Sequence, residues 1–465
     1  QLSARHILSD KPALPIPAWT GLDAGFVWLH DVRCACVEAP PEAGKAAEWL
    51  LDNDYQIHRA LRQIRDDLPG TFYERLPALS SEPEERVPRV FALAHELLNA
   101  TKLQTSLANV VRFVRAYQHA TVLTIAELWA FPTMLRIASF EILVSALTPL
   151  ACCERELPFR VTDWSVDPES LDPTERVARS IANLIAIAAI PWEEFFDRTS
   201  LVEEVLGQDP SGFYSRMDFA SRDRYRRRVE ALARYSSTSE PDVAAEAVEQ
   251  AASHKANEAA SHVGYWLVGT GRPHLEGRVG ARFPLGQRLR QLVMRHPGKV
   301  YLLALILAGI GALLLPIAYL YLIGASLPGW IGGLLLSFIP ASILAITVVN
   351  WIITRSLPPR VLDKLDFSKG LAEDCRTIVT VPVIVASPGE VSKLAEQIET
   401  HWLANADPML QVALLAEWPD APDVRLPEEE AIVADLESQI RGLNDRHGKA
   451  GRAPFHLLVR PRYFN

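Results

Sequence analysis

Four charged side chains near the end of the sequence are of the types that can hold a nucleotide. Glu417 and Asp420 follow one short apolar run, and Arg460 and Arg462 follow the next one along the chain. Carboxylates can accept hydrogen bonds from a nucleoside, and guanidinium groups can neutralise a diphosphate. The alternative is that all four are ordinary loop charges, and their spacing alone leaves both interpretations open.

The segment that carries these residues alternates between strand and helix patterns. Apolar, β-branched runs predict strands, and the run at 377–386 predicts a buried parallel strand. Apolar positions at helical spacing predict the helices between the strands. In chain order the elements are a strand at 377–386, a helix at 388–403, a strand at 411–416, a helix at 427–444 and a strand at 455–459. This order predicts the opening of a doubly wound parallel sheet, in which ligands bind beyond the carboxyl ends of the strands. The sheet would be incomplete, so we expect any metal-binding acidic motif and any catalytic base beyond residue 465.

Two apolar stretches ahead of this segment predict a membrane hairpin. Residues 300–323 contain no charge and would span roughly 36 Å as a helix, and 330–353 repeat the pattern. The uncharged loop 324–329 joins them, whereas arginine and lysine residues flank both sides. Both flanks should therefore be cytoplasmic. A hairpin buried in a soluble core is the alternative, and two charge-free runs of this length disfavour it.

The residues just before the hairpin combine arginines with apolar side chains. Phe283, Leu285, Leu289, Leu292 and Val293 alternate with the arginines as they would in an interfacial helix beside anionic lipid. A helix that docks on the soluble part of the protein fits the pattern equally well.

The region before residue 280 has the periodicity of a helical bundle. Thr124 followed by Glu127 forms a capping-box pattern at the start of a long apolar helix. Arg136 and Glu141 argue against that helix as a membrane span, and the apolar run 181–191 is too short to be one.

Two stretches of this region contain residues that could bind phosphate. Six arginines stand in 209–230, which could grip a phosphate or a lipid headgroup, although a solvated, salt-bridged helix face is the favoured interpretation. The glycines of 264–271 resemble a phosphate loop, but His274 occupies the place of the last glycine in the G-x-G-x-x-G pattern. We therefore expect a turn there.

Composition excludes several classes of protein. The chain has 465 residues and a formal net charge of -9, which argues against a nucleic-acid-binding protein. Its five cysteines show neither zinc spacing nor a disulfide framework, and this favours a reducing, cytoplasmic setting. The first residue is Gln1 instead of a methionine, so we expect the sequence to start inside a longer product.

Long stretches of the chain resemble the membrane-bound cyclic β-1,2-glucan synthases of bacteria. The matching segments are 49–79, 112–138, 201–230 and 262–276 before the hairpin, and 365–391, 401–422 and 455–465 after it. The resemblance implies an enzyme that takes glucose from UDP-glucose, builds a protein-linked β-1,2-glucan and closes it into a ring. It also implies a transferase domain of the GT-A type with a divalent metal, Mg or Mn, and a phosphorylase-like domain farther along. The chain would then be roughly the first sixth of the protein.

The resemblance also assigns expectations to single residues. Glu417 or Asp420 would face the uridine; Glu417 stands where the family has an aspartate, so the assignment lies between the two. Arg460 and Arg462 match the family's RPR segment near the nucleotide. No catalytic residue and no metal ligand can be carried over to this chain. A tyrosine hydroxyl is a reasonable primer for a protein-linked glucan, and Tyr463 is the candidate nearest the nucleotide edge.

These arguments predict a mainly α chain that ends in the start of an α/β domain. The expected parts are a cytoplasmic helical domain at 1–280, a basic amphipathic juxtamembrane segment at 281–298, a two-helix transmembrane hairpin at 299–354, a linker at 355–376 and a truncated GT-A-like nucleotide-sugar domain at 377–465. The expected function is that of the N-terminal part of a UDP-glucose-dependent glucosyltransferase, inactive by itself, in the bacterial inner membrane. The expected partners are UDP-glucose, membrane lipids and the growing glucan. The alternative is a non-catalytic membrane scaffold or regulatory region of a glycosyltransferase complex.

Overall fold

The protein divides into two compact units, which are described separately. The computed structural model describes residues 6–37, 44–80, 86–150, 156–161, 171–357, 359, 361–405, 407–421, 423, 426–448 and 452–462. The helical unit is Gln1–Asp363, and the sheet unit is Lys364–Asn465. Tyr463 lies outside the described residues.

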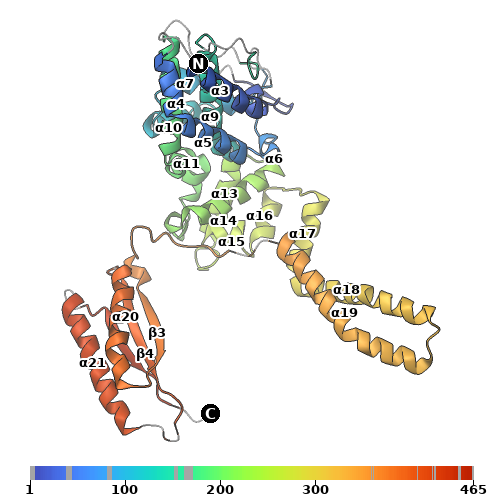
Figure 1. The fold of residues 1–465 in the computed structure, drawn as a ribbon, viewed down its shortest axis with the longest axis vertical. Helices are drawn as coiled ribbons and strands as arrows, with labels where there is room; N and C mark the ends of the chain where they lie inside the picture. The colour runs from blue at the N-terminus through green and yellow to red at the C-terminus, as the bar shows by residue number, and fades with distance from the viewer. Residues whose placement is uncertain are drawn as a thin grey trace. The chain divides into compact units, whose positions relative to one another are not determined.

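The helical unit begins with a bundle of helices and one short strand pair (Figure 1). Its first elements are β1 (Leu8–Ser9), α2 (Pro17–Thr20), α3 (Leu22–Val37), α4 (Gly44–Asp52), α5 (Asp54–Asp67), α6 (Gly70–Tyr73), β2 (Ala78–Leu79), α7 (Arg89–Ala100), α8 (Leu107–Gln118), α9 (Ile125–Leu147), α10 (Pro173–Ala189), α11 (Trp192–Thr199) and α12 (Leu201–Leu206). Strands β1 and β2 pair in antiparallel orientation.

Helix α9 forms the centre of this bundle, and helices α5, α7 and α10 pack against it. The predicted capping box is present: the Thr124 hydroxyl accepts from the Glu127 N–H, and the Glu127 carboxylate accepts from the Thr124 N–H. Its buried polar side chains have partners, including Arg89 to Glu127 at 2.5 Å and His95 to Glu141 at 3.0 Å. Although α9 is long and apolar enough to cross a membrane, it is a core helix of the unit.

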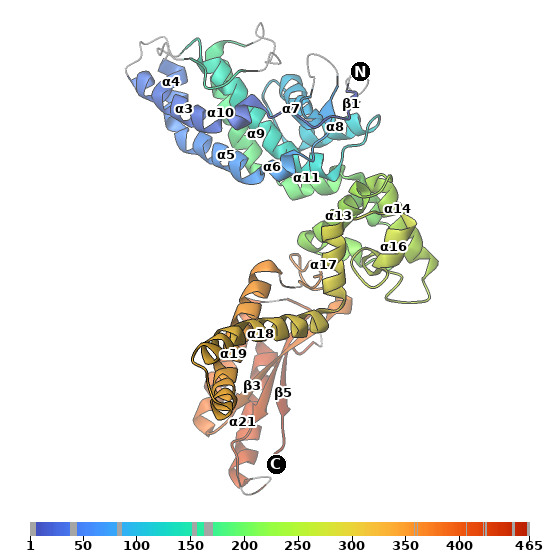
Figure 2. The ribbon, with the colours of Figure 1, turned by 90° about the vertical axis from the view of Figure 1, so that its right-hand side faces the viewer.

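A second group of helices follows in the same unit (Figure 2). Its elements are the 3-10 helix η2 (Tyr214–Arg216), α13 (Phe219–Arg234), α14 (Glu240–Ser253), α15 (Val263–Leu267), α16 (Arg272–Arg278) and α17 (Leu285–Arg295).

Gly269 and Gly271 lie in the expected turn after α15. The Gly271 N–H donates to the Tyr265 carbonyl at 3.0 Å, which folds the chain back. A Cβ on Gly271 would lie 2.6 Å from the Tyr265 ring. These glycines therefore permit close packing in a helix–turn–helix segment.

The apolar hairpin consists of α18 (Pro297–Leu322) and α19 (Leu327–Ser356), which lie side by side and antiparallel (Figure 1). Among the described residues, three helices have the length and composition of a membrane span: these two and the buried α9. Gly324 adopts a φ of +60° in the loop, a conformation that favours glycine. Most large apolar side chains of α18 and α19 are exposed, as lipid-facing helices require.

The sheet unit has the predicted order of strands and helices. Its elements are the 3-10 helix η3 (Glu373–Cys375), β3 (Thr377–Ile384), η4 (Pro388–Glu390), α20 (Val391–Ala404), β4 (Leu410–Glu417), α21 (Pro427–His447) and β5 (Phe455–Val459). The three strands are parallel in the order β3–β4–β5. Helices α20 and α21 pack on one face of the sheet, over a core that includes Val412, Leu414 and Ala416.

The other face of the sheet is open. Ile378, Ile384 and Leu458 are 50%, 65% and 45% exposed. The prediction of a strand at 377–386 is confirmed apart from its last two residues, but its expected burial is wrong. β3 is an edge strand of the described sheet and has helices on only one side, whereas parallel strands usually have both faces covered.

Candidate functional site

The carboxyl ends of β4 and β5 bring the predicted site residues together. In the parallel register Glu417, the last residue of β4, lies opposite Ile384 of β3. The Arg460 N–H donates to the Ala416 carbonyl at 2.9 Å, which extends the pairing one residue past β5. The ladder thus places Glu417 and Arg460 side by side at this edge.

Glu417 and Arg460 form an ion pair. Arg460 Nη1 lies 2.9 Å from Glu417 Oε1, and the two side chains are 65% and 32% exposed for the arginine and the glutamate. A pair this exposed contributes at most about 1 kcal/mol, so an incoming anion can replace it at small cost. Arg460 therefore presents a largely exposed guanidinium at this edge.

Arg462 has a different environment, although the sequence groups it with Arg460. Its Nε donates to the Pro419 carbonyl at 2.7 Å, and its Nη1 donates to the Asp423 carbonyl at 3.3 Å. It also pairs with Glu429 at the start of α21, and only 12% of its side chain is exposed. Arg462 therefore fixes the loop after β4 to α21. Asp420 is exposed on that loop.

A hollow of about 530 Å³ lies beside these strand ends. Trp418, Val459 and Pro461 line one side, and Glu430 and Glu437 of α21 are among the residues on the other. The indole and the aliphatic side chains could hold a planar ring, and the carboxylates could accept hydrogen bonds from it. Sequence reasoning missed this hollow because α21 contributes more than half of its lining.

The expected divalent metal finds no ligand set in the part of the chain that the structure describes. Within it, no three His, Cys, Asp or Glu side chains are close enough to hold an ion together. The metal stays an expectation for the intact protein.

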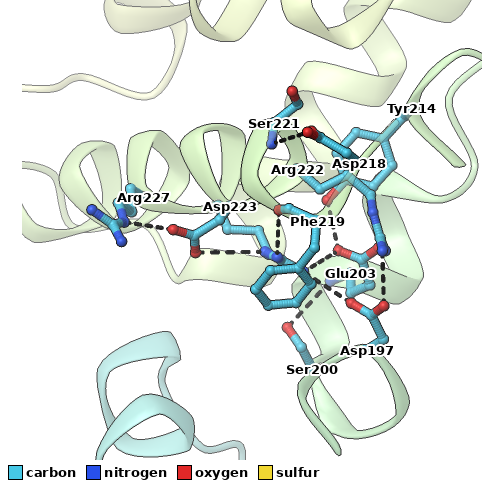
Figure 3. Close-up of polar contacts among 11 residues, drawn as sticks. Asp197, Ser200, Glu203, Tyr214, Asp218, Phe219, Ser221, Arg222, Asp223 and Arg227 are labelled. Atoms are coloured by element: carbon cyan, nitrogen blue, oxygen red, sulfur yellow. Dashed lines mark hydrogen bonds and ion pairs between the residues drawn. The ribbon is translucent and has the colours of Figure 1, made fainter. Parts of the chain in front are cut away.

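The six-arginine segment is the second place where the sequence allowed a phosphate site. Arg222 binds Asp197 at 2.8 Å and also pairs with Glu203 (Figure 3). Arg226 lies 3.1 and 2.9 Å from the same two carboxylates. Asp223 pairs with Arg227 at 2.7 Å on the same helix.

The environment of Arg226 shows that this network is structural. Its side chain is fully buried, and its guanidinium lies 4.6 Å from the Phe196 ring centre and 4.4 Å from that of Phe219. The salt-bridged interpretation of 209–230 is confirmed, but the expected solvation is wrong for the pairs of Arg222 and Arg226. They face α11 and α12 instead of water.

Sequence reasoning also missed a chain of polar contacts around His262. Asp209 Oδ2 lies 2.8 Å from His262 Nδ1, and His262 Nε2 lies 3.1 Å from the Tyr225 hydroxyl. The Tyr225 hydroxyl donates to Asp363 at 2.9 Å, and Arg224 pairs with the same carboxylate. The segment that leaves the hairpin is therefore attached to α13. No local pattern could reveal contacts between residues this far apart in the chain.

Together the fold and the strand-end pair define a class of protein. It has a helical unit, an apolar hairpin of membrane-spanning length, and a parallel α/β unit with charged side chains at the strand ends, where such sheets bind ligands. No family model matches the chain. A curated relative, the cyclic β-(1,2)-glucan synthase NdvB of Rhizobium meliloti (strain 1021), is 28% identical over 537 aligned positions. That alignment includes all of this chain and 18% of the relative, so the chain spans less than a fifth of the relative's length. The resemblance inferred from the sequence is confirmed.

Proposed function

We propose that this chain is the N-terminal part of a membrane glucosyltransferase that polymerises glucose from UDP-glucose into cyclic β-1,2-glucan. The observation that carries the proposal is the similarity to the cyclic β-(1,2)-glucan synthase NdvB along the whole chain. The parallel sheet is in agreement, since the strand-end edge of such sheets is where ligands bind. We propose a GT-A-like domain that begins with this sheet.

The proposed roles follow from the contacts at the edge. Arg460 would leave Glu417 and bind the diphosphate, because a phosphate oxygen offers a stronger partner than an exposed carboxylate. Glu417, released from that pair, or Asp420 would accept a hydrogen bond from the uridine. The hollow beside Trp418 is of suitable size for the base. Arg462 would hold the loop in place without touching the ligand.

The proposed reaction needs more than this edge supplies. A β-linkage made from an α-linked donor requires in-line attack, a base for the acceptor hydroxyl and stabilisation of the leaving diphosphate. Arg460 addresses only the last requirement. A divalent metal would add to that stabilisation, and the described residues provide no set of ligands for it.

The localisation proposed with this function is the bacterial inner membrane, with both ends of the hairpin cytoplasmic. Arg288 and Arg295 precede the spans and Arg355 follows them, whereas the loop between them is uncharged. Membrane lipids and the growing glucan are the proposed partners besides UDP-glucose.

Two measurements test the proposal at different levels. Membranes that contain the intact protein should incorporate labelled glucose from UDP-glucose into a β-1,2-linked, protein-bound product. A well-folded preparation that incorporates none would contradict the proposed activity.

The second measurement addresses this chain alone, in detergent, by titration calorimetry with UDP. Arg460→Gln should weaken UDP binding by about tenfold, since it removes a charge-assisted contact. Arg441→Gln is the matched control, because Arg441 is exposed on α21 away from the strand ends. If the chain folds but binds no UDP, the alternative of a non-catalytic membrane scaffold is favoured for this part of the protein. The tether from Asp363 to α13 is the feature that favours such a role.

A further inference from the structure

The helical unit contains a large cavity that the proposed function does not use. Its volume is about 700 Å³, within the range of sites for small ligands. Residues of α5, α6, α9, α11 and α13 and their adjoining loops surround it. Every one of these elements belongs to the helical unit, so the cavity is separate from the strand-end edge.

The charged residues of the cavity carry an excess of positive charge. Four arginines line it, Arg75, Arg136, Arg227 and Arg234, against the two carboxylates of Asp67 and Glu230. Glu230 serves both Arg75 and Arg234, and Asp67 lies 3.3 Å from Arg136. Arg227 pairs with Asp223, which lies outside the cavity lining, and 72% of its side chain is exposed (Figure 3).

Two of these guanidinium groups have unused hydrogen-bond capacity. Arg136 is 6% exposed, and among the described residues its Nε has no hydrogen-bond partner. The same holds for the buried Nε of Arg75. Burial lowers the pKa of Arg75, and the nearby charges of Arg234 and Arg227 lower it further, although Glu240 opposes the shift. Arg75, Arg227 and Arg234 repel one another around the cavity, so a bound anion would stabilise this cluster of charges.

Five aromatic side chains also line the cavity, among smaller apolar and polar residues. Phe72, Trp129, Trp192, Phe195 and Phe196 all contribute, and Trp129 is 36% exposed. Aromatic faces of this kind stack on planar bases and on the apolar faces of sugar rings. An exposed indole beside clustered arginines can hold a ring and its charged group at the same time.

We infer that this cavity binds a small phosphate-bearing ring compound, either a nucleotide or a sugar phosphate. The phosphate would lie among Arg75, Arg227 and Arg234, and the ring would lie against Trp129. A neutral saccharide would leave the excess of guanidinium charge uncompensated, whereas an inorganic anion would leave the aromatic wall unused. The inference does not depend on the proposed transferase activity, since it concerns other residues in the other unit.

Hydrogen exchange of the full chain in detergent, followed by mass spectrometry, tests the inference. The probes are AMP, glucose 1-phosphate and inorganic phosphate, each added alone. We expect AMP or glucose 1-phosphate to protect the peptides that cover residues 67–75, 126–136 and 227–234. Whichever of the two protects at lower concentration identifies the source of the ring. Inorganic phosphate should need at least tenfold more.

Variants and a matched control complete the test. The double substitution Arg227→Gln and Arg234→Gln removes two partly exposed charges and should raise the half-saturating ligand concentration at least tenfold. Arg278→Gln removes an arginine of intermediate exposure that pairs with Glu246 outside the cavity, and it should change nothing. Absence of protection with all three probes would overturn the inference, as would equal protection in the double variant. Because the readout comes from the helical unit, either result is distinguishable from a failure of UDP binding at the strand ends.

Discussion

Arg226 shows how a residue type can misdirect sequence interpretation. The segment 209–230 is rich in charge, and such segments usually lie on the surface. Arg226 is instead enclosed by Phe196 and Phe219 and by two carboxylates from α11 and α12. The salt bridges could be predicted from composition. The burial could not, because Phe196 and the two carboxylates come from other helices.

The first prediction concerns this buried arginine. Arg226→Met would leave Asp197 and Glu203 with Arg222 as their remaining cation, in an interface where Glu203 is 11% exposed and Asp197 is 30% exposed. Removing one partner of a buried ion pair costs about 3–5 kcal/mol, so the unfolding temperature in detergent should fall strongly. Arg112→Met, at an exposed position on α8, should leave the transition unchanged. An equal transition in both variants would show that the network is not structural.

The second prediction concerns Glu240, whose carboxylate accepts from the Ile125 N–H at 2.7 Å. Burial raises its pKa to about 7, although the hydrogen bond from Ile125 opposes the shift. The folded state therefore holds a proton that the unfolded chain releases near pH 4.5. This contribution, about 3 kcal/mol at most, is complete below pH 4.5 and is lost as pH rises through 7.

The measurement is the unfolding temperature of the helical unit across pH 4.5 to 8. Glu240→Gln should flatten the decline seen in the unaltered chain between pH 4.5 and 7. Glu249→Gln, an exposed change on the same helix, should preserve it. A slope that survives Glu240→Gln would assign the effect to another group.

At the scale of elements, the sequence predicts most of the sheet unit. The predicted strands at 411–416 and 455–459 correspond to Leu410–Glu417 and Phe455–Val459, and the helix at 427–444 to Pro427–His447. Each element there is a short run whose pattern is local. The open face of β3 could not be predicted, because a β-branched run looks the same whether one or both faces are covered.

The candidate site was predictable for the same reason, but only in part. Glu417 and Arg460 meet because parallel strands end at one edge, which follows from the topology. Arg462 contacts Pro419 and Glu429 because of how the loop after β4 folds. Loop conformation has no periodic sequence pattern from which these contacts could be predicted. The hollow beside Trp418 likewise depends on the placement of α21.

The third prediction concerns the hairpin. Ile310 lies near the middle of α18 and is 55% exposed, so Ile310→Arg would place a charge at the centre of the hydrocarbon layer. The insertion cost is about 2.5–3.5 kcal/mol. Glycosylation mapping of the hairpin should report less insertion of α18. Leu322→Arg at the last residue of the same helix should have little effect, since a long basic side chain there can reach the interface.

At the scale of the whole molecule, both ends of the hairpin are attached to the same part of the helical unit. On the entry side, the Arg282 N–H donates to the Tyr235 carbonyl at 2.6 Å, and the Phe283 ring packs 5.3 Å from the Tyr235 ring. On the exit side, Asp363 is held by Arg224 and Tyr225. Helix α13 and the residue that follows it therefore hold both connections.

The fourth prediction tests the exit connection. Arg224→Gln removes the contacts to Asp363 and to the Val361 carbonyl, so the exposed segment around Lys364 should become more mobile and enter the protease site more readily. Limited trypsin digestion should then cut at Lys364 several times faster, as mass spectrometry of early fragments would show. Arg112→Gln should leave the cleavage rate unchanged. Unaltered cleavage in the Arg224 variant would mean that the connection does not persist in solution.

The segments before and after the hairpin are held at Tyr235 and at α13, and this has a mechanical consequence. A bilayer whose thickness does not match the apolar length of α18 and α19 makes the pair tilt. Because the entering and leaving segments are fixed at Tyr235 and at Arg224, that tilt would be transmitted to α13 as a torque between two points. Helix α13 would thereby respond to the thickness of the bilayer, and Arg227 and Arg234 would move as it rotates.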